Sequence, residues 1–249
     1  MNVVLKSSSN PVSRHAKRGE IPHLQMPGSR TPEGNHQPLL VSLKGLSGRV
    51  GILGGTFDPV HVGHLASAQL AARAGRQDSI IFVPTAKNPL KDKSPQAGNL
   101  ARLELLIAAL ADEPGMFVSP VQLLGEVGNY TIDLARHIKR KSPLAELTLI
   151  IGSDCLADLL KWKVIHELLE IAQFAVIERP GYPVAADLQL DGFSAREYRL
   201  ILGNILRGVT VEASSTVLRW ELESGGEGGG MLPPGVGTLI RERGLYRRG

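Results

Sequence analysis

The chain has 249 residues, of which 43% are hydrophobic and 21% charged, and its formal net charge is +4. This composition is that of an ordinary soluble globular domain and excludes a wholly disordered chain. The single cysteine, Cys155, excludes an intramolecular disulfide and is typical of a reducing compartment, so we expect a cytoplasmic protein. No apolar run is long enough to cross a membrane. Lysines and arginines are spread along the chain, which argues against a nucleic-acid partner.

The first part of the chain, residues 1–46, combines Pro, Ser, Gly, Lys and Arg with few aliphatic residues. Such a segment buries too little apolar surface to offset the entropy lost on ordering. We therefore predict a disordered N-terminal extension over residues 1–46 and one folded domain over residues 47–249.

Short apolar runs alternate with helical patterns through the rest of the chain. The predicted strands are 49–53, 79–83, 116–119, 147–151, 174–177 and 209–211. Helices are predicted over 62–74, 99–110, 131–141, 154–170 with a break near Trp162, 195–206, from 214 onward, and 233–243. Residues 224–230 are a glycine-rich stretch that we expect to be flexible.

This alternation predicts an α/β fold: a Rossmann-like, doubly wound, mostly parallel sheet of five to six strands with helices on both faces. In such sheets, ligands bind beyond the carboxyl ends of the strands, at the point where the strand order reverses. The loop after the first predicted strand is therefore the first place to look for a site.

That loop reads Gly54-Gly55-Thr56-Phe57-Asp58-Pro59-Val60-His61-Val62-Gly63-His64. Glycines allow backbone N–H groups to approach an anion, and His61 and His64 share one face of the following helix. The helix N-terminus adds a partial positive charge, so the loop predicts a polyphosphate pocket. Two plainer interpretations stay open: surface or capping histidines, and a zinc site, although no third ligand lies nearby in the sequence.

A second candidate phosphate element follows the last predicted strand. Ser214, Ser215 and Thr216 begin a helix, where their hydroxyls could cap backbone N–H groups and donate to phosphate oxygens. Arg219 lies one turn later, and its guanidinium suits a phosphate. The plainer alternative is a capped helix with a solvated arginine.

The first of these motifs resembles the signature of the nucleotidylyltransferase superfamily, and its G-G-T-F-D-P version is similar to that of the bacterial nicotinate-nucleotide adenylyltransferases. Four further segments are similar to motifs of that family: Ser214–Arg219, Ile150–Asp154, Asn129–Asp133 and Pro84–Lys91. In the last of them Leu90 stands where the family has histidine. The resemblance covers about residues 48 to 246.

The resemblance implies a domain over residues 47–249 that transfers AMP from ATP to nicotinate mononucleotide, giving nicotinate adenine dinucleotide and pyrophosphate. It implies His61, His64 and Arg219 as catalytic residues. It implies ATP contacts by Gly54, Gly55, Thr56, Phe57, Gly152, Asp154, Ser214, Ser215 and Thr216. Nicotinate mononucleotide contacts are implied for Tyr130, Thr131, Trp162 and Lys91, with the indole of Trp162 stacked on the pyridine ring.

The expected cofactor is Mg²⁺, held mainly through substrate phosphates and water, so no metal-ligating side chains are predicted. One alternative function is transfer to nicotinamide mononucleotide or another phosphorylated acceptor. Another is a non-catalytic nucleotide-binding module. The sequence leaves the oligomeric state open, a homo-oligomer included.

Overall fold

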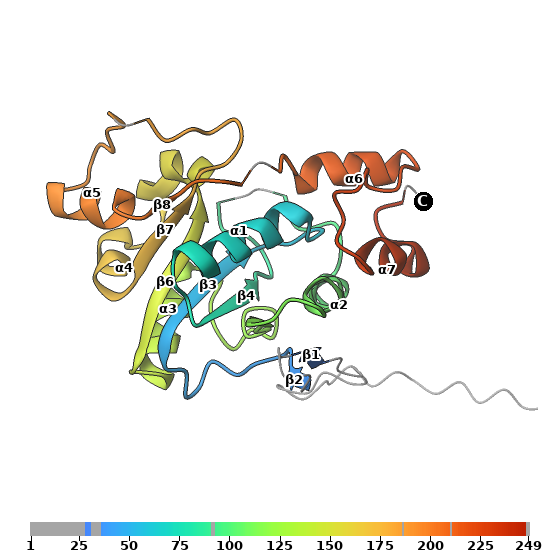
Figure 1. Cartoon of the computed structure of the whole chain (residues 1–249), viewed down its shortest axis with the longest axis horizontal. Coiled ribbons are helices and arrows are strands. Elements are labelled where there is room, and N and C mark those ends of the chain that lie inside the picture. Colours follow the sequence, from blue (N-terminus) through green and yellow to red (C-terminus); the bar gives the residue numbers. More distant parts are fainter. Residues whose placement is uncertain (1–27, 31–35, 91–92, 186, 210, 248–249) are drawn as a thin grey trace, which may run out of the picture.

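The computed structural model describes residues 28–30, 36–90, 93–185, 187–209 and 211–247. Its centre is a sheet of six strands in the order β5-β4-β3-β6-β7-β8 (Figure 1), in which every neighbouring pair is parallel. The strands are β3 (Gly48–Gly55), β4 (Ser79–Pro84), β5 (Met116–Val118), β6 (Ala145–Gly152), β7 (Gln173–Ile177) and β8 (Ile205–Leu206). Two short strands, β1 (Gly28–Arg30) and β2 (His36–Pro38), pair antiparallel with each other.

Helices connect the strands of the large sheet. They are α1 (Val62–Ala74), α2 (Asn99–Leu110), α3 (Thr131–Lys141), the 3₁₀ helix η1 (Ser153–Lys161), α4 (Ile165–Ile171) and α5 (Ala195–Leu202). Two more helices, α6 (Ser215–Glu223) and α7 (Val236–Arg243), follow β8. The break predicted near Trp162 is present between η1 and α4. None of the described helices is both long enough and apolar enough to cross a lipid bilayer.

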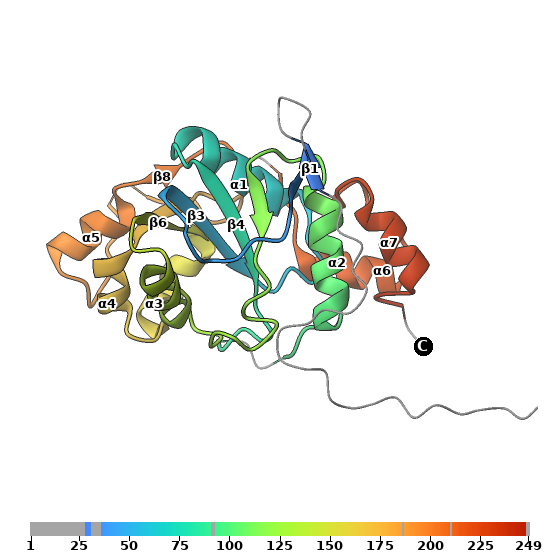
Figure 2. The same cartoon turned by 90° about the horizontal axis from the view of Figure 1, so that it is seen from below.

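The strands are buried on both faces of the sheet. Along β4, Ile80 and Phe82 belong to a core shared with α1, α2 and α7, whereas Ile81 and Val83 belong to a core shared with α3, α4 and α5. Figure 2 shows α2 beside α7 at one end of the molecule and α3 beside α4 at the other. The predicted doubly wound α/β fold with helices on both faces is therefore confirmed.

The sixth strand lies earlier than predicted. The helix expected over 195–206 ends at Leu202, because Gly203 caps it and leaves Ile205 and Leu206 free to extend the sheet. The amide of Val176 donates to the carbonyl of Asn204, which joins β8 to β7. Of the strand predicted over residues 209–211, residues 209 and 211 are not in a strand, and residue 210 lies outside the described part.

The N-terminal boundary of the domain is also earlier than predicted. Leu39 and Leu43 are buried, at 0% and 2% exposure. The amide of Val118 in β5 donates to the carbonyl of Leu39, and the amide of Val41 donates to the carbonyl of Val118. The boundary at residue 47 is therefore wrong, because the averaged composition of residues 1–46 hid a short apolar segment. Residues 1–27 and 31–35, for which disorder was predicted, lie outside the described residues.

The strand order reverses at β3. From β3 the chain proceeds outward to β4 and β5, and then returns to the other side of β3 to build β6, β7 and β8. The carboxyl ends of β3 and β6, at Gly55 and Gly152, lie next to each other at this switch point. The predicted loop after β3 thus occupies the ligand-binding position of this fold class.

Candidate active site

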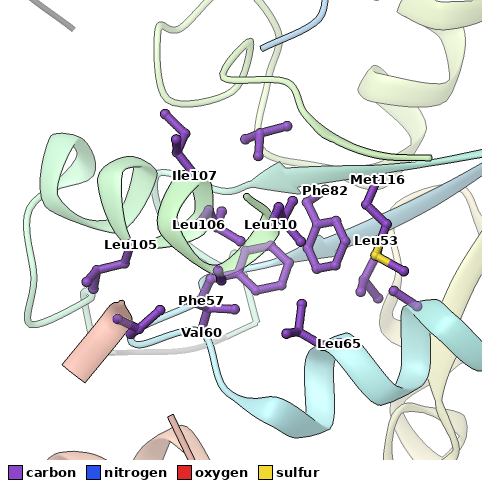
Figure 3. Close-up of a cluster of buried hydrophobic side chains, with 14 of the residues drawn as sticks. Leu53, Phe57, Val60, Leu65, Phe82, Leu105, Leu106, Ile107, Leu110 and Met116 are labelled. Carbon is purple, nitrogen blue, oxygen red and sulfur yellow. The ribbon is translucent and has the colours of Figure 1, made fainter. Parts of the chain in front are cut away.

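The loop after β3 is anchored by a buried aromatic ring. Phe57 is 1% exposed and has a positive φ of 47°. Figure 3 shows its ring between the first helix and α2, near Leu106 and Phe82. A Cβ at Gly55 would lie 3.1 Å from that ring, so only glycine fits there without a shift. The side chain of Phe57 therefore packs in the core, in contrast to the prediction that it lines the nucleotide site.

The two predicted histidines lie together at the first turn of α1. The rings of His61 and His64 are stacked, with centroids 3.7 Å apart and planes 24° from parallel. The amide of His61, the N-cap residue, donates to Nδ1 of His64 over 3.2 Å. In its neutral form His64 therefore carries its proton on Nε2, which makes that nitrogen a hydrogen-bond donor. The ring of Phe57 also contacts His64 in a T-shaped arrangement, with centroids 5.0 Å apart.

His61 is buried, and its imidazole is uncharged near neutral pH. Burial, assisted by the positive charge of Arg179, lowers the pKa of His61 to about 4. Its Nδ1 is buried without a hydrogen-bond partner among the described residues. A bound polyphosphate would counter both effects, because its negative charge favours the protonated imidazole. A Cβ at Gly63 would lie 3.1 Å from the same Nδ1, so glycine at this position leaves room for the imidazole ring.

The lowered pKa of His61 predicts acid sensitivity. In the unfolded chain the imidazole takes up a proton near its ordinary pKa of 6.5, but in the folded chain only near 4. Stability should therefore fall by about 3 kcal/mol as pH decreases from 6.5 to 4. Urea unfolding of the native and His61→Asn chains across this range should show a smaller pH dependence in the variant. Parallel curves would contradict this, since His137 acts in the same direction in both chains.

The N-terminus of α6 lies against the same loop. Ser215 Oγ donates to the carbonyl of Pro59 over 3.0 Å, and Nη1 of Arg219 donates to the carbonyl of Asp58 over 2.6 Å. The second Arg219 nitrogen, Nη2, donates to Thr216 Oγ1. Ser214 is the N-cap residue but makes no side-chain capping bond, so the predicted hydroxyl capping is wrong. The structure thus brings the two predicted phosphate elements together.

A buried arginine holds the loops around the site. Arg102 in α2 is 0% exposed and donates to the carbonyls of Thr56, Thr85, Ala86 and Ala97 and to Asn99 Oδ1. Burial lowers its pKa, while the nearby charge of Asp58 opposes that shift. The burial of Arg102 was not predicted from the sequence, because charged residues on amphipathic helices are expected at the surface.

An ion pair between Asp154 and Arg179 lies at the carboxyl end of β6. Nη1 of Arg179 lies 3.1 Å from Oδ2 of Asp154, and Oδ1 of Asp154 is buried without a hydrogen-bond partner among the described residues. A Cβ at Gly152 would lie 2.1 Å from Oδ1 of Asp154 and 2.6 Å from Nε of Arg179, so no side chain fits. The pairing of Arg179 with Asp154 was not predicted, although an Arg-Pro-Gly turn begins two residues after the predicted strand 174–177.

Three of the four residues predicted to bind the acceptor lie at the start of α3 and at the η1–α4 turn: Tyr130, Thr131 and Trp162. Tyr130 is the N-cap residue of α3, and Thr131 begins that helix, as predicted. Lys163 bridges the two elements, with Nζ 4.5 Å from the Tyr130 ring centroid and 3.7 Å from Asp133 Oδ1. Trp162 is partly buried against the core beneath α3 and α4. Lys91 lies outside the described residues.

The family comparison agrees with this geometry. Residues 52–218 match the Cytidylyltransferase-like family, which places the chain in the class of nucleotidyltransferase folds that the sheet and its switch-point histidines define. A protein of Herpetosiphon aurantiacus, named "Probable nicotinate-nucleotide adenylyltransferase", is 36% identical over 198 residues, covering 80% of this chain and 98% of the relative. A protein of the same name from Opitutus terrae is 37% identical over 199 residues, with the same coverage. The chain belongs to the nicotinate-nucleotide adenylyltransferase family.

Solved structures share the fold. The nicotinic acid mononucleotide adenylyltransferase of Plasmodium falciparum, complexed with NaAD, has a TM-score of 0.65 and 18% sequence identity, covering 80% of this chain and 97% of its own. A putative nicotinate-nucleotide adenylyltransferase from Vibrio parahaemolyticus has a TM-score of 0.56 and 20% identity, covering 82% and 98%. At these identities the similarity concerns the fold alone.

Proposed function

We infer that this chain transfers the adenylyl group of ATP to the phosphate of nicotinate mononucleotide, which releases pyrophosphate and gives nicotinate adenine dinucleotide. One observation carries the inference: the stacked pair His61 and His64 and the arginine Arg219 converge on the same loop at the sheet's switch point. This arrangement supplies imidazole and guanidinium donors to one polyphosphate. Family membership supports the choice of substrates.

The reaction requires that the acceptor phosphate be aligned with the α-phosphorus of ATP and that the negative charge of the phosphates be neutralised. An anionic phosphate oxygen of the acceptor attacks the α-phosphorus of ATP, the new P–O bond forms, and the bond to pyrophosphate breaks. The nucleophile is already ionised, so no general base is needed. Positioned donors such as Nε2 of His64 and the guanidinium of Arg219 stabilise the negative charge on the transferring phosphorus and the leaving group.

We assign the remaining predicted residues by their positions. Backbone at Gly54, Gly55, Thr56 and Phe57 faces the triphosphate together with the Ser214–Thr216 turn, and Gly152 with Asp154 receives the adenosine. The Asp154 Oδ1 atom, which has no described partner, offers an acceptor to a ribose hydroxyl. Tyr130 and Thr131 at the N-terminus of α3 hold the nicotinate carboxylate, where the helix dipole favours an anion. Lys91 is a further candidate for phosphate contact.

Mg²⁺ is the proposed cofactor. The described residues contain no group of three His, Cys, Asp or Glu side chains that could hold a metal, so phosphate oxygens and water would supply most of its ligands. When bound, the ion neutralises phosphate charge. We expect excess EDTA to abolish turnover and added MgCl₂ to restore it, measured by pyrophosphate release. Full turnover in EDTA would contradict the assignment.

The indole of Trp162 is expected to stack on the pyridine ring. Trp162→Ala should raise the KM for nicotinate mononucleotide roughly 3- to 10-fold, because such stacking contributes about 0.5–1.5 kcal/mol beyond area burial. The KM for ATP should change little. Trp220→Ala is the matched control, since Trp220 is 66% exposed on α6 and should leave both constants unchanged. Equal rises in both KM values for Trp162→Ala would remove the stacking argument.

The direct test of the function is pyrophosphate release by the purified chain with ATP and either pyridine mononucleotide. We expect turnover with nicotinate mononucleotide and much weaker turnover with nicotinamide mononucleotide. A preference for the amide would reassign the acceptor. ATP binding with no pyrophosphate release from either acceptor would support a nucleotide-binding module instead.

A further inference from the structure

The C-terminal end of the chain contacts the loop after β3 through a buried tyrosine. The hydroxyl of Tyr246 donates to Oδ1 of Asp58 over 2.9 Å, although 188 positions separate the two residues. Tyr246 is 4% exposed and Asp58 3% exposed, so water does not compete for this bond. The pKa of Tyr246 is raised by burial and by the adjacent Asp58 carboxylate, which keeps the phenol protonated as a donor.

The carboxylate of Asp58 contacts three separate segments: the C-terminal end at Tyr246, the loop before α2, and α6 at Arg219. Its Oδ1 also accepts from the amide of Ala97, and its Oδ2 accepts from the amide of Gln96 over 2.7 Å. Oδ2 lies 3.8 Å from Nη1 of Arg219, the same nitrogen that donates to the Asp58 carbonyl. Each carboxylate oxygen therefore has a defined direction, and one of them faces the guanidinium proposed to meet the phosphates.

The turn that ends α7 directs the side chain of Tyr246 toward the Asp58 carboxylate. Gly244 takes the left-handed conformation that ends α7, with φ 62°, and the amide of Leu245 donates to the carbonyl of Ile240 in a Schellman-type turn. Tyr246 itself has φ 60°, which a bulky residue adopts only when its surroundings hold it there. The contacts of its side chain supply that restraint.

The same C-terminal region holds the loop at two further points. The carbonyl of Met231 accepts from the amide of Val62, the first residue of α1, and Ser215 Oγ donates to Pro59. Tyr246 and Met231 both lie beyond position 218, where the family match ends, and they contact the loop on either side of His61, at Asp58 and at Val62.

We propose that Tyr246 and Asp58 are positioning residues for the adenylyl transfer. The phenol of Tyr246 orients the Asp58 carboxylate. This carboxylate and the backbone carbonyl of Asp58 together orient Arg219 relative to the pair His61 and His64. Arg219 is thereby oriented before ATP arrives. Losing the hydroxyl should leave the binding of the acceptor intact and weaken the stabilisation of the leaving pyrophosphate. This inference rests on the proposed function.

The test is Tyr246→Phe, which keeps the buried ring and removes only the donor. We expect kcat to fall roughly tenfold, the size expected for one hydrogen bond to a charged group. The KM for nicotinate mononucleotide should stay within twofold. Tyr198→Phe is the matched control, because it also removes a hydroxyl bonded to protein, to the carbonyl of Leu188, away from the site. The control should leave kcat unchanged.

A double-mutant cycle separates positioning from mere stability. In an Arg219→Lys background the guanidinium is gone, so Tyr246→Phe should have little further effect on kcat. Effects that multiply, or a Tyr246→Phe chain with a lowered melting temperature and native kcat, would overturn the proposal. An inactive native chain would instead refute the proposed function, so the two failures are distinguishable.

Discussion

His64→Ala is expected to lower kcat about 10²- to 10³-fold, which is the usual cost of removing one preorganised donor to transition-state charge. His64 is placed by three contacts at once: the amide of His61 on Nδ1, the stacked His61 ring, and the edge of Phe57. Pyrophosphate release at saturating substrates measures the effect.

The fold should survive this change. Losing the bond between His64 Nδ1 and the N-cap amide costs about 1 kcal/mol, comparable to a lost helix cap. The matched control is His166→Ala, since His166 pairs with Glu197 on the far side of the sheet and is 57% exposed. It should keep native turnover. A His64→Ala chain with near-native kcat would reject the assignment of His64.

Arg102→Met is expected to destabilise the protein by about 3–5 kcal/mol, the range for breaking a buried, fully hydrogen-bonded ionic group. Methionine fills a similar volume but donates to none of the carbonyls at Thr56, Thr85 and Ala97. Those oxygens would be left buried and unpaired, and the Asp58 carboxylate would lose a nearby positive charge. Urea unfolding monitored by circular dichroism gives the free energy directly.

Two further variants make this stability test specific. Arg102→Lys keeps the charge but cannot reach as many acceptors, so its loss should be intermediate. Arg199→Met, at an exposed position of α5, should change stability by less than about 0.5 kcal/mol. Native stability of Arg102→Met would show that the loop carbonyls find other donors.

Much of the fold could be predicted because its strands are short apolar runs between clear turn signals. The loop after β3 and the segment at Ser215 were also recognisable, because glycines, paired histidines and a hydroxyl-rich helix start each have a local chemical meaning. Strand β8 was misplaced because two residues, Ile205 and Leu206, carry no periodicity. A helix followed by so short a strand reads as one longer helix.

The remaining parts depend on contacts between distant segments. The burial of Arg102 depends on four carbonyls from two loops, and no local pattern shows that a charged side chain will be enclosed. The pairing of Tyr246 with Asp58 joins the two ends of the domain. Phe57 sits inside the best-matched motif yet faces the core, because a motif gives residue types and not the direction of each side chain.

The segment at Leu39 and Val41 has a consequence for how the protein can assemble. Its backbone occupies the hydrogen-bonding groups of Val118 on the outer margin of β5, where a bare strand would otherwise be a template for another chain. A recombinant version trimmed to the length of its relatives would uncover that margin and become prone to aggregate. A second copy that paired with β5 at Val118 would therefore have to displace the segment at Leu39 and Val41.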